Sequence, residues 1–140
     1  MGQKDNRQDA IRKLVRRKAI GSYEQLADEL RAMGHRSADG TIARDMSEIG
    51  MGKVGGIYVL DSDVGLRRVL PLFVERCERA HNLVVIGTVS GAEHAVASAI
   101  EDASLPDVMC AALGVGSVLV ACRSDDGASS LVELVDTLTR

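Results

Sequence analysis

Aromatic residues are nearly absent from this chain of 140 residues. It has no tryptophan, two tyrosines and one phenylalanine, which together make up 2% of the sequence. Proteins that bind single-stranded nucleic acid usually stack bases on aromatic side chains. The composition therefore argues against that class of protein. The hydrophobic content of 46% is enough for a core, which must be built from aliphatic residues and methionine.

Cysteines and long apolar runs are also scarce. Cys77, Cys110 and Cys122 are odd in number and fit no zinc or redox spacing. Their apolar neighbours predict three small core residues in a cytoplasmic protein. The charged N-terminus does not have the pattern of a signal peptide. The longest apolar run, residues 83–86, is too short to cross a bilayer, so we expect no membrane partner.

The sequence contains no pattern with a catalytic mechanism. An enzyme would have to use Cys110, Cys122 or His94, and none of these stands in a Ser-His-Asp, Cys-His or paired-carboxylate arrangement. Cysteines with apolar flanks are more often core residues than nucleophiles. We therefore predict no enzymatic activity, no catalytic residue, no metal site and no cofactor.

Charge is distributed unevenly along the chain. The net charge is −3, but residues 1–60 carry 11 basic and 8 acidic groups, and residues 61–140 carry 6 and 12. Residues 1–20 alone have 7 basic and 2 acidic side chains. Phosphate contacts supply most of the non-specific affinity for DNA, and only the surface that faces the duplex needs positive charge. The asymmetry predicts a DNA-binding first part joined to an acidic assembly part.

Residues 20–60 have the pattern of a winged helix-turn-helix. A preceding helix is expected from Asn6 or Arg7 to Lys18, with residues 1–5 frayed. A second begins at Ser22, which has capping-box spacing to Gln25. A third runs from Ser37 or Asp39 to a stop at Gly50. Residues 53–59 then predict a small hairpin, or wing, that turns at two glycines.

The third helix is the predicted recognition helix. Its apolar residues at 42, 46 and 49 form one face, which leaves the opposite face free for the major groove. Arginine can pair with guanine edges, and threonine can reach a phosphate or a thymine methyl group. The alternative is that Arg44 pairs with Asp45 or Glu48 on the surface, which would be common and nearly neutral in energy. The candidate DNA-binding residues are Gly40, Thr41, Arg44, Ser47 and, at the base of the wing, Lys53.

The rest of the chain predicts an α/β assembly domain. The expected order is strand, strand, helix, strand, strand, helix, beginning at residue 72, and Pro71 closes a connecting helix. The last two strands are expected at residues 108–113 and 117–122. With only two helices, one face of the sheet would be poorly covered, which usually means a partner subunit. The fold class is therefore α/β, of the α+β type. Its parts are a winged helix-turn-helix (1–60), a linker and connecting helix (61–71) and an oligomerisation and effector-binding domain (72–140).

The whole chain resembles the bacterial arginine repressor family. That family's recognition helix has a Thr-Gln-x-Thr-Val-Ser-Arg-Asp-like signature, and its strand-to-helix turn reads Val-Ile-x-Thr-x-Pro-Gly-Ala. The matching stretches here are residues 38–45, where Thr41, Arg44 and Asp45 agree, and residues 84–92. The resemblance implies a regulator of arginine metabolism that assembles into trimers or hexamers (dimers of trimers). It also implies that L-arginine bound between subunits favours operator binding.

This chain departs from the family pattern in the ligand turn. The family carries Gly-Asp-Asp there, with carboxylates that grip the ligand, whereas Gly114 is followed here by Val115 and Gly116. A buried guanidinium without a carboxylate loses its charge-assisted pair. Glu101 lies near the family's helix acid, and His94 replaces a polar residue one turn after Gly91. The resemblance thus implies an effector pocket with altered or lost arginine sensing. Its six residues would be Gly91, His94, Glu101, Gly114, Val115 and Gly116.

Two functions follow from the sequence. The first is a DNA-binding transcriptional regulator, resembling a repressor, of arginine biosynthesis or catabolism genes, whose partners are a double-stranded operator and other copies of itself. The alternative is an oligomeric partner subunit that modulates a related repressor and binds DNA weakly itself. Strong, salt-dependent DNA binding by the pure protein would distinguish them. In the recognition helix, Asp39 and Ala43 replace the family's Gln and Ser, which implies an altered operator preference.

Overall fold

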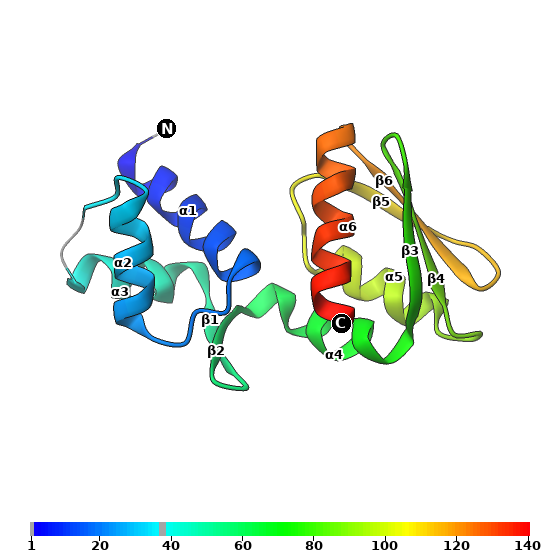
Figure 1. The fold of residues 1–140 in the computed structure, drawn as a ribbon, viewed down its shortest axis with the longest axis horizontal. Helices are drawn as coiled ribbons and strands as arrows, with labels where there is room; N and C mark the ends of the chain where they lie inside the picture. Colours follow the sequence, from blue (N-terminus) through cyan, green and yellow to red (C-terminus); the bar gives the residue numbers. More distant parts are fainter. Residues whose placement is uncertain (1, 37–38) are drawn as a thin grey trace. The chain divides into compact units, whose positions relative to one another are not determined.

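The computed structural model describes residues 2–36 and 39–140 (Figure 1). The chain divides into two compact units, Met1–Asp61 and Ser62–Arg140. Each unit has its own cluster of buried aliphatic residues. The near absence of aromatic side chains is therefore compatible with two small cores built from leucine, isoleucine, valine and alanine.

Three helices form most of the first unit: α1 (Gln3–Arg17), α2 (Tyr23–Ala32) and α3 (Asp39–Ile49). Helix α1 begins three residues before the expected Asn6, so the prediction that residues 1–5 fray is wrong from Gln3 onward. The predicted cap of α2 is present: Ser22 Oγ accepts from Gln25 N at 3.1 Å, and Gln25 Oε1 accepts from Gly21 N at 3.0 Å. A start of the third helix at Ser37 lies outside the described residues.

The wing follows α3 as the hairpin β1 (Met51–Val54) and β2 (Ile57–Leu60). Gly55 and Gly56 join the strands with φ angles of 61° and 84°, values that side chains larger than hydrogen disfavour. The amide of Tyr58 donates a hydrogen bond to Ile20 O at 2.8 Å. This bond anchors β2 to the segment between α1 and α2, so the wing is part of the first unit's hydrogen-bonded frame.

The second unit is a four-stranded antiparallel sheet with three helices. Its elements are a 3-10 turn η1 that begins in the preceding unit (Asp61–Asp63), α4 (Val64–Phe73), β3 (Val74–Ala80), β4 (Leu83–Thr88), α5 (Glu93–Asp102), β5 (Val108–Leu113), β6 (Ser117–Cys122) and α6 (Asp125–Thr139). The strand order is β3-β4-β6-β5. Of these, β5 and β6 have the predicted bounds.

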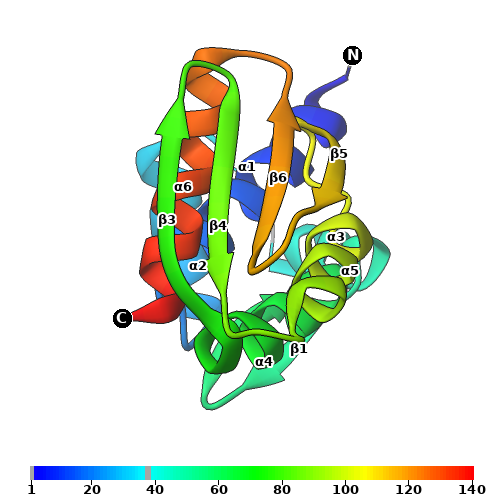
Figure 2. The same ribbon diagram turned by 90° about the vertical axis from the view of Figure 1, so that its right-hand side faces the viewer.

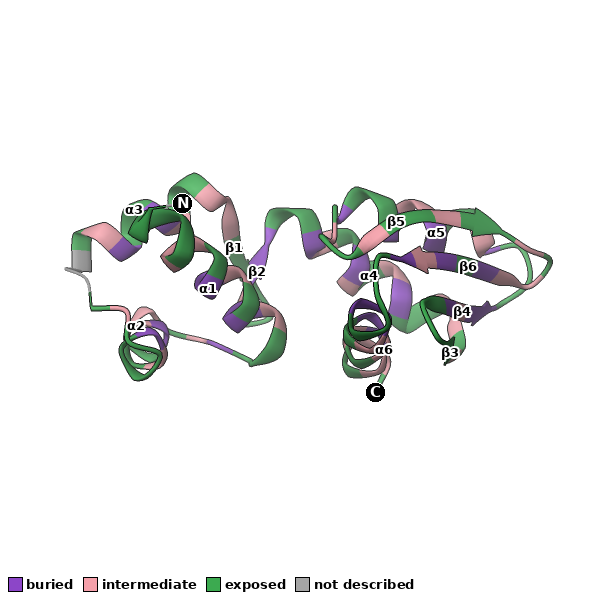
Figure 3. Cartoon of the chain, turned by 90° about the horizontal axis from the view of Figure 1, so that it is seen from above, coloured by how far each residue is buried: buried purple, intermediate pink, exposed green. Residues whose placement is uncertain are grey.

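One face of this sheet is covered by helices and the other is not. Helices α5 and α6 pack on the same face, where Val84, Ile86, Val118 and Val120 are buried. No described helix of this unit lies over the opposite face, which Figure 2 views directly. In Figure 3, β6 carries mostly buried and half-buried residues, whereas much of the edge strand β5 is exposed. The expectation of a poorly covered sheet face therefore matches the architecture.

The segment between the two predicted domains differs from the expected linker. Leu66 and Leu70 of α4 are fully buried in the core of the second unit, so α4 belongs to that unit. The helix also continues through Pro71 to Phe73, so β3 begins at Val74, two residues after the expected start of the strand at Leu72. Pro71 has no amide hydrogen to donate to the carbonyl of Arg67, so α4 forms with one helical hydrogen bond fewer.

Candidate DNA-binding surface and effector pocket

The recognition helix α3 presents its polar residues as the sequence pattern predicts. Ile42 is buried at 3% exposure, and Met46 and Ile49 are half-buried against the first unit's core. Arg44 and Ser47 are exposed, whereas Thr41 is half-buried. The free side of the helix therefore offers an arginine and a hydroxyl, with Thr41 at its margin.

Gly40 and Lys53 complete the predicted DNA-binding set. Gly40 is exposed, and a Cβ added there would meet no atom within 4 Å, so the protein itself does not require a glycine at this position. Lys53 lies opposite Tyr58 in the wing, one residue pair from the turn and thus nearer its tip than its base. Its Nζ is 5.2 Å from the centre of the Tyr58 ring, a cation–π distance.

Asp45 and Glu48 of α3 are paired with α1 and not with Arg44. Arg7 forms a two-pronged ion pair with Asp45: Nε donates to Oδ2, and Nη2 donates to Oδ1 at 3.1 Å. Gln8 Nε2 donates to Asp45 Oδ1 at 3.1 Å and to Glu48 Oε2 at 2.8 Å. Lys4 Nζ lies 2.9 Å from the same Glu48 oxygen. The alternative pairing of Arg44 with Asp45 or Glu48 is absent from the described structure.

These contacts determine the charge states on this surface. Burial raises the pKa of the Asp45 carboxyl, but hydrogen bonds from Arg7 and Gln8 and nearby positive charge outweigh it, so the net pKa is below its ordinary value. The hydrogen bond to Asp45 raises the pKa of Arg7. Hydrogen bonds from Lys4 and Gln8 lower the pKa of Glu48. Both carboxylates are therefore ionised and compensated at neutral pH.

The six predicted effector-pocket residues fall into two groups within the second unit. The turn before α5 and the turn between β5 and β6 meet at Glu93, whose Oε1 accepts from Gly116 N at 2.9 Å and from Gly91 N at 3.4 Å. In the second turn, Gly114 N donates to Ser117 O at 2.8 Å, and Val115 is fully exposed. His94 is exposed on the first turn of α5.

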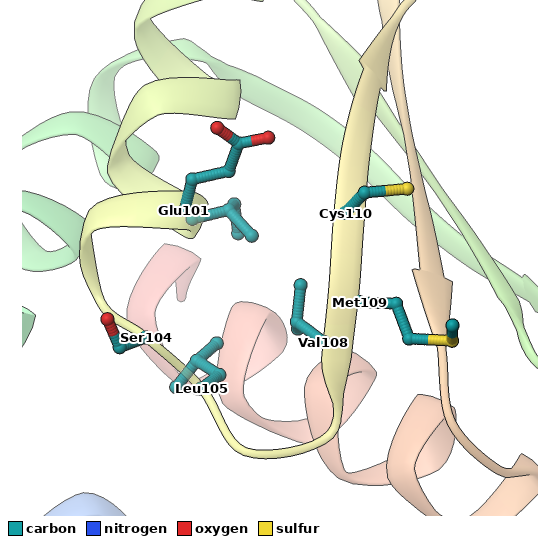
Figure 4. Close-up of a pocket in the computed structure, with 7 residues that line it drawn as sticks. Glu101, Ser104, Leu105, Val108, Met109 and Cys110 are labelled. Carbon is teal, nitrogen blue, oxygen red and sulfur yellow. The ribbon is translucent and has the colours of Figure 1, made fainter.

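Glu101 is separated from that group by the length of α5. Glu101 stands eight positions after Glu93 along the helix, a rise of about 12 Å. Glu101 Oε1 accepts from Ala111 N at 3.3 Å and lines a shallow cavity of about 350 Å³ between α5 and β5. Figure 4 shows Val108 pointing from β5 toward the helix and Cys110 pointing away from the cavity. Within one chain, the structure does not bring Glu101 to Val115 and Gly116.

Several contact residues were not found from the sequence. Lys4, Arg7 and Gln8 stand on α1, and no local pattern indicates that they contact Asp45 and Glu48 of α3. Glu93 carried a weak signal, since it is an acidic residue in the first turn of a helix that follows a glycine. Its own backbone amide and those of Gly116 and Gly91 lower its pKa.

The cysteines differ from one another in their surroundings. Cys122 is buried and Cys77 half-buried, but Cys110 is exposed, so the prediction of three core cysteines is wrong for Cys110. Its side chain projects from the edge strand β5, on the face that no described helix of the second unit covers. Burial, with Asp136 and Glu78 adding to it, raises the pKa of the Cys77 thiol to about 11.

Neither a metal cluster nor a membrane helix is found in residues 2–36 and 39–140. There, no group of three histidine, cysteine, aspartate or glutamate residues is placed to hold a metal ion. No helix in these ranges has both the length and the apolar character that crossing a membrane requires.

Two family models together span most of the chain. The model described as "Arginine repressor, DNA binding domain" matches residues 2–64, and the one described as "Arginine repressor, C-terminal domain" matches residues 71–137. The first contains α3 and the wing, and the second contains the sheet with α5 and α6.

Similar curated proteins carry the same name. The arginine repressor of Thermotoga petrophila is 31% identical over 147 residues, covering 96% of this chain and 97% of the relative. Those of Thermus thermophilus (30% identical, 94% and 87% covered) and Moorella thermoacetica (31%, 93% and 94%) are similar over nearly their full lengths. These relatives are named as repressors and not as enzymes. The chain therefore belongs to the arginine repressor family of DNA-binding transcription regulators.

Proposed function

We propose that this regulator controls genes of arginine biosynthesis or catabolism by binding a double-stranded operator through α3 and the wing. The observation that carries the proposal is the state of Arg44. It is exposed and has no ion pair in the described structure, while the carboxylates at 45 and 48 are both held by α1. A free guanidinium on an exposed helix face is what two-pronged recognition of a guanine edge requires.

The neighbouring residues take complementary roles. Ser47 lies one turn beyond Arg44 and supplies a hydroxyl for a phosphate or base edge. Thr41, half-buried, contacts the phosphate backbone at the margin of the helix face. Gly40 leaves room for the duplex to approach the start of α3, and Lys53 places a positive charge on the wing beside a second stretch of phosphate.

The second unit carries self-association in this proposal. Its uncovered sheet face presents Val85, Cys110, Ala112, Leu119 and Ala121, which the strand registers place side by side. Leu119 is 41% exposed although it stands on an inner strand of the sheet. An apolar patch of this kind fits a second copy of the chain, in a trimer or a dimer of trimers.

Arginine sensing is altered or lost in this proposal. Val115 puts an aliphatic side chain at the tip of the β5–β6 turn, and the amide of Gly116 is already bonded to Glu93. Neither residue offers a carboxylate to a guanidinium. The carboxylate of Glu101 lies at the other end of α5, next to the shallow cavity, and would have to bind a ligand there without help from the turn.

Fluorescence anisotropy tests both parts of the proposal. A duplex enriched by the unaltered chain from a random 20-base-pair pool is the probe, and a shuffled duplex of equal composition is the control. Each is titrated at two salt concentrations, with and without millimolar L-arginine. We expect tight, salt-dependent binding that prefers the enriched duplex and ignores arginine. Failure to enrich any sequence, with weak binding even at low salt, would favour the partner-subunit alternative, and binding only with arginine would overturn the loss of sensing.

A further inference from the structure

Helices α1 and α3 are joined by an ion pair that lies next to the proposed DNA-binding residues. The ion pair of Arg7 and Asp45 is almost removed from solvent, with side-chain exposures of 13% and 2%. Arg7 uses two nitrogens on two oxygens of the same carboxylate, a geometry that fixes both distance and orientation. The ion pairs Lys4–Glu48, Arg12–Asp9, Lys18–Glu29 and Arg31–Asp28 of the first unit are more exposed.

The same contact between α1 and α3 also compensates the negative charge of Glu48. Glu48 stands one helical turn after Arg44, at a spacing that allows a surface ion pair between them. Lys4 and Gln8 instead bond the Glu48 carboxylate from α1, at 2.9 and 2.8 Å. Gln8 joins the two pairs because its amide also reaches Asp45. One turn of α1 thus compensates both carboxylates next to the DNA-facing residues.

We propose that Arg7 is a positioning residue for DNA binding. It holds α3 against α1 through Asp45, and it keeps that carboxylate away from the surface that Arg44 and Ser47 offer to a duplex. Arg7 itself does not touch DNA in this proposal. The inference depends on the proposed recognition through α3, and it adds a residue of α1 that no part of the sequence pattern indicated.

The experiment compares full-length variants on the enriched and shuffled duplexes described above, at 25 °C and over a series of salt concentrations. Arg7→Gln leaves the buried Asp45 carboxylate without its charged partner, and we expect at least a tenfold loss of affinity for the enriched duplex. Arg7→Gln with Asp45→Asn removes both charges, and we expect affinity within threefold of the unaltered chain. Arg12→Gln is the matched control, since Arg12 lies on the same helix and pairs with Asp9 at the surface. We expect less than a twofold change for it.

The salt dependence separates positioning from direct contact. The binding constant falls as salt rises, and each lost phosphate contact makes the plot of log K against log salt less steep by about 0.9. We expect Arg7→Gln to leave the slope unchanged. If the plot for Arg7→Gln were less steep by the amount of one contact, and the double variant did not recover the affinity, Arg7 would bind phosphate. That result would overturn the proposal. A lower melting temperature with unchanged affinity would reduce the pair to a structural role and would also overturn it.

Arg7→Lys covers the case in which Arg7→Gln does not fold. Lysine keeps the charge but cannot make the two-pronged bond. We expect a three- to tenfold loss of affinity, and affinity equal to that of the unaltered chain would contradict the positioning role. If the unaltered chain enriches no sequence, the proposed function fails. If it does, and Arg7→Gln binds equally well, only this inference fails.

Discussion

Glu93 Oε1 accepts a hydrogen bond from the amide of Gly116 at 2.9 Å, across 23 residues of sequence. The same oxygen lies 3.4 Å from the amide of Gly91. A single carboxylate thereby ties the turn before α5 to the turn between β5 and β6. Both turns contain positions that the sequence assigned to the effector pocket, and Glu93 was not among them.

This contact predicts a pH dependence of the β5–β6 turn. Backbone hydrogen bonds lower the pKa of Glu93 below its ordinary value of 4.5. A carboxyl whose pKa is lower in the folded chain stabilises it above the unfolded-state pKa, and this contribution is lost as the pH falls through the folded-state pKa. The amide signal of Gly116 in NMR spectra should therefore titrate with a midpoint below 4.5. Glu93→Gln should abolish the titration, and a midpoint at or above 4.5 would contradict the contact.

Arg44→Ala should weaken binding to the enriched duplex by about 1–3 kcal/mol, the usual size of one base contact. The reason is that Arg44 is exposed and has no ion pair to lose within the described structure. Anisotropy on enriched and shuffled duplexes measures the effect, and Arg12→Ala controls for the loss of one positive charge. Equal losses on both duplexes would show that Arg44 contacts phosphate and does not read bases.

Leu119→Glu should disrupt self-association. The change places a carboxylate in the middle of the uncovered sheet face, where burial against another subunit would strip its hydration. Analytical ultracentrifugation at micromolar concentration should show a smaller species than for the unaltered chain. Ser130→Glu, on the exposed side of α6, adds the same charge and should leave the assembly intact. An unchanged sedimentation coefficient for Leu119→Glu would place the subunit interface elsewhere.

Val115→Asp should create or strengthen an arginine response. The fully exposed side chain at the tip of the turn can be replaced without disturbing a core. A carboxylate there can pair with a guanidinium by charge-assisted hydrogen bonds. Isothermal titration calorimetry with L-arginine measures the effect, with Val115→Asn as the uncharged control. Arginine binding of equal strength in the unaltered chain would show that sensing has not been lost. The neighbouring Gly116 is a poorer site, because its φ of +75° disfavours a side chain.

Local signals in the sequence predicted most of the secondary structure. The Ser22–Gln25 spacing located the start of α2, and the glycine pair at 55 and 56 located the wing turn. The turn residues at 106–107, 114–116 and 125–127 located the bounds of β5 and β6. Each of these signals acts within a few residues, where backbone geometry and side-chain preference determine the outcome.

The errors arise where distant residues decide the structure. The first turns of α1 lack an apolar pattern and looked frayed, but Lys4 and Arg7 bond carboxylates of α3. Helix α4 looked like a linker because its burial depends on α5 and α6, which come later in the chain. Cys110 has apolar neighbours in sequence, yet it projects from an edge strand. The sequence predicted one pocket from Glu101 and the residues of the two turns, because it does not show that the length of α5 separates them.

The two buried clusters described above have no member in common. Cooperative melting depends on burial that is shared, so each unit has its own source of cooperativity. A substitution inside one cluster then changes mainly the stability of the unit that contains it. The two units can therefore accumulate core substitutions at different rates over evolution.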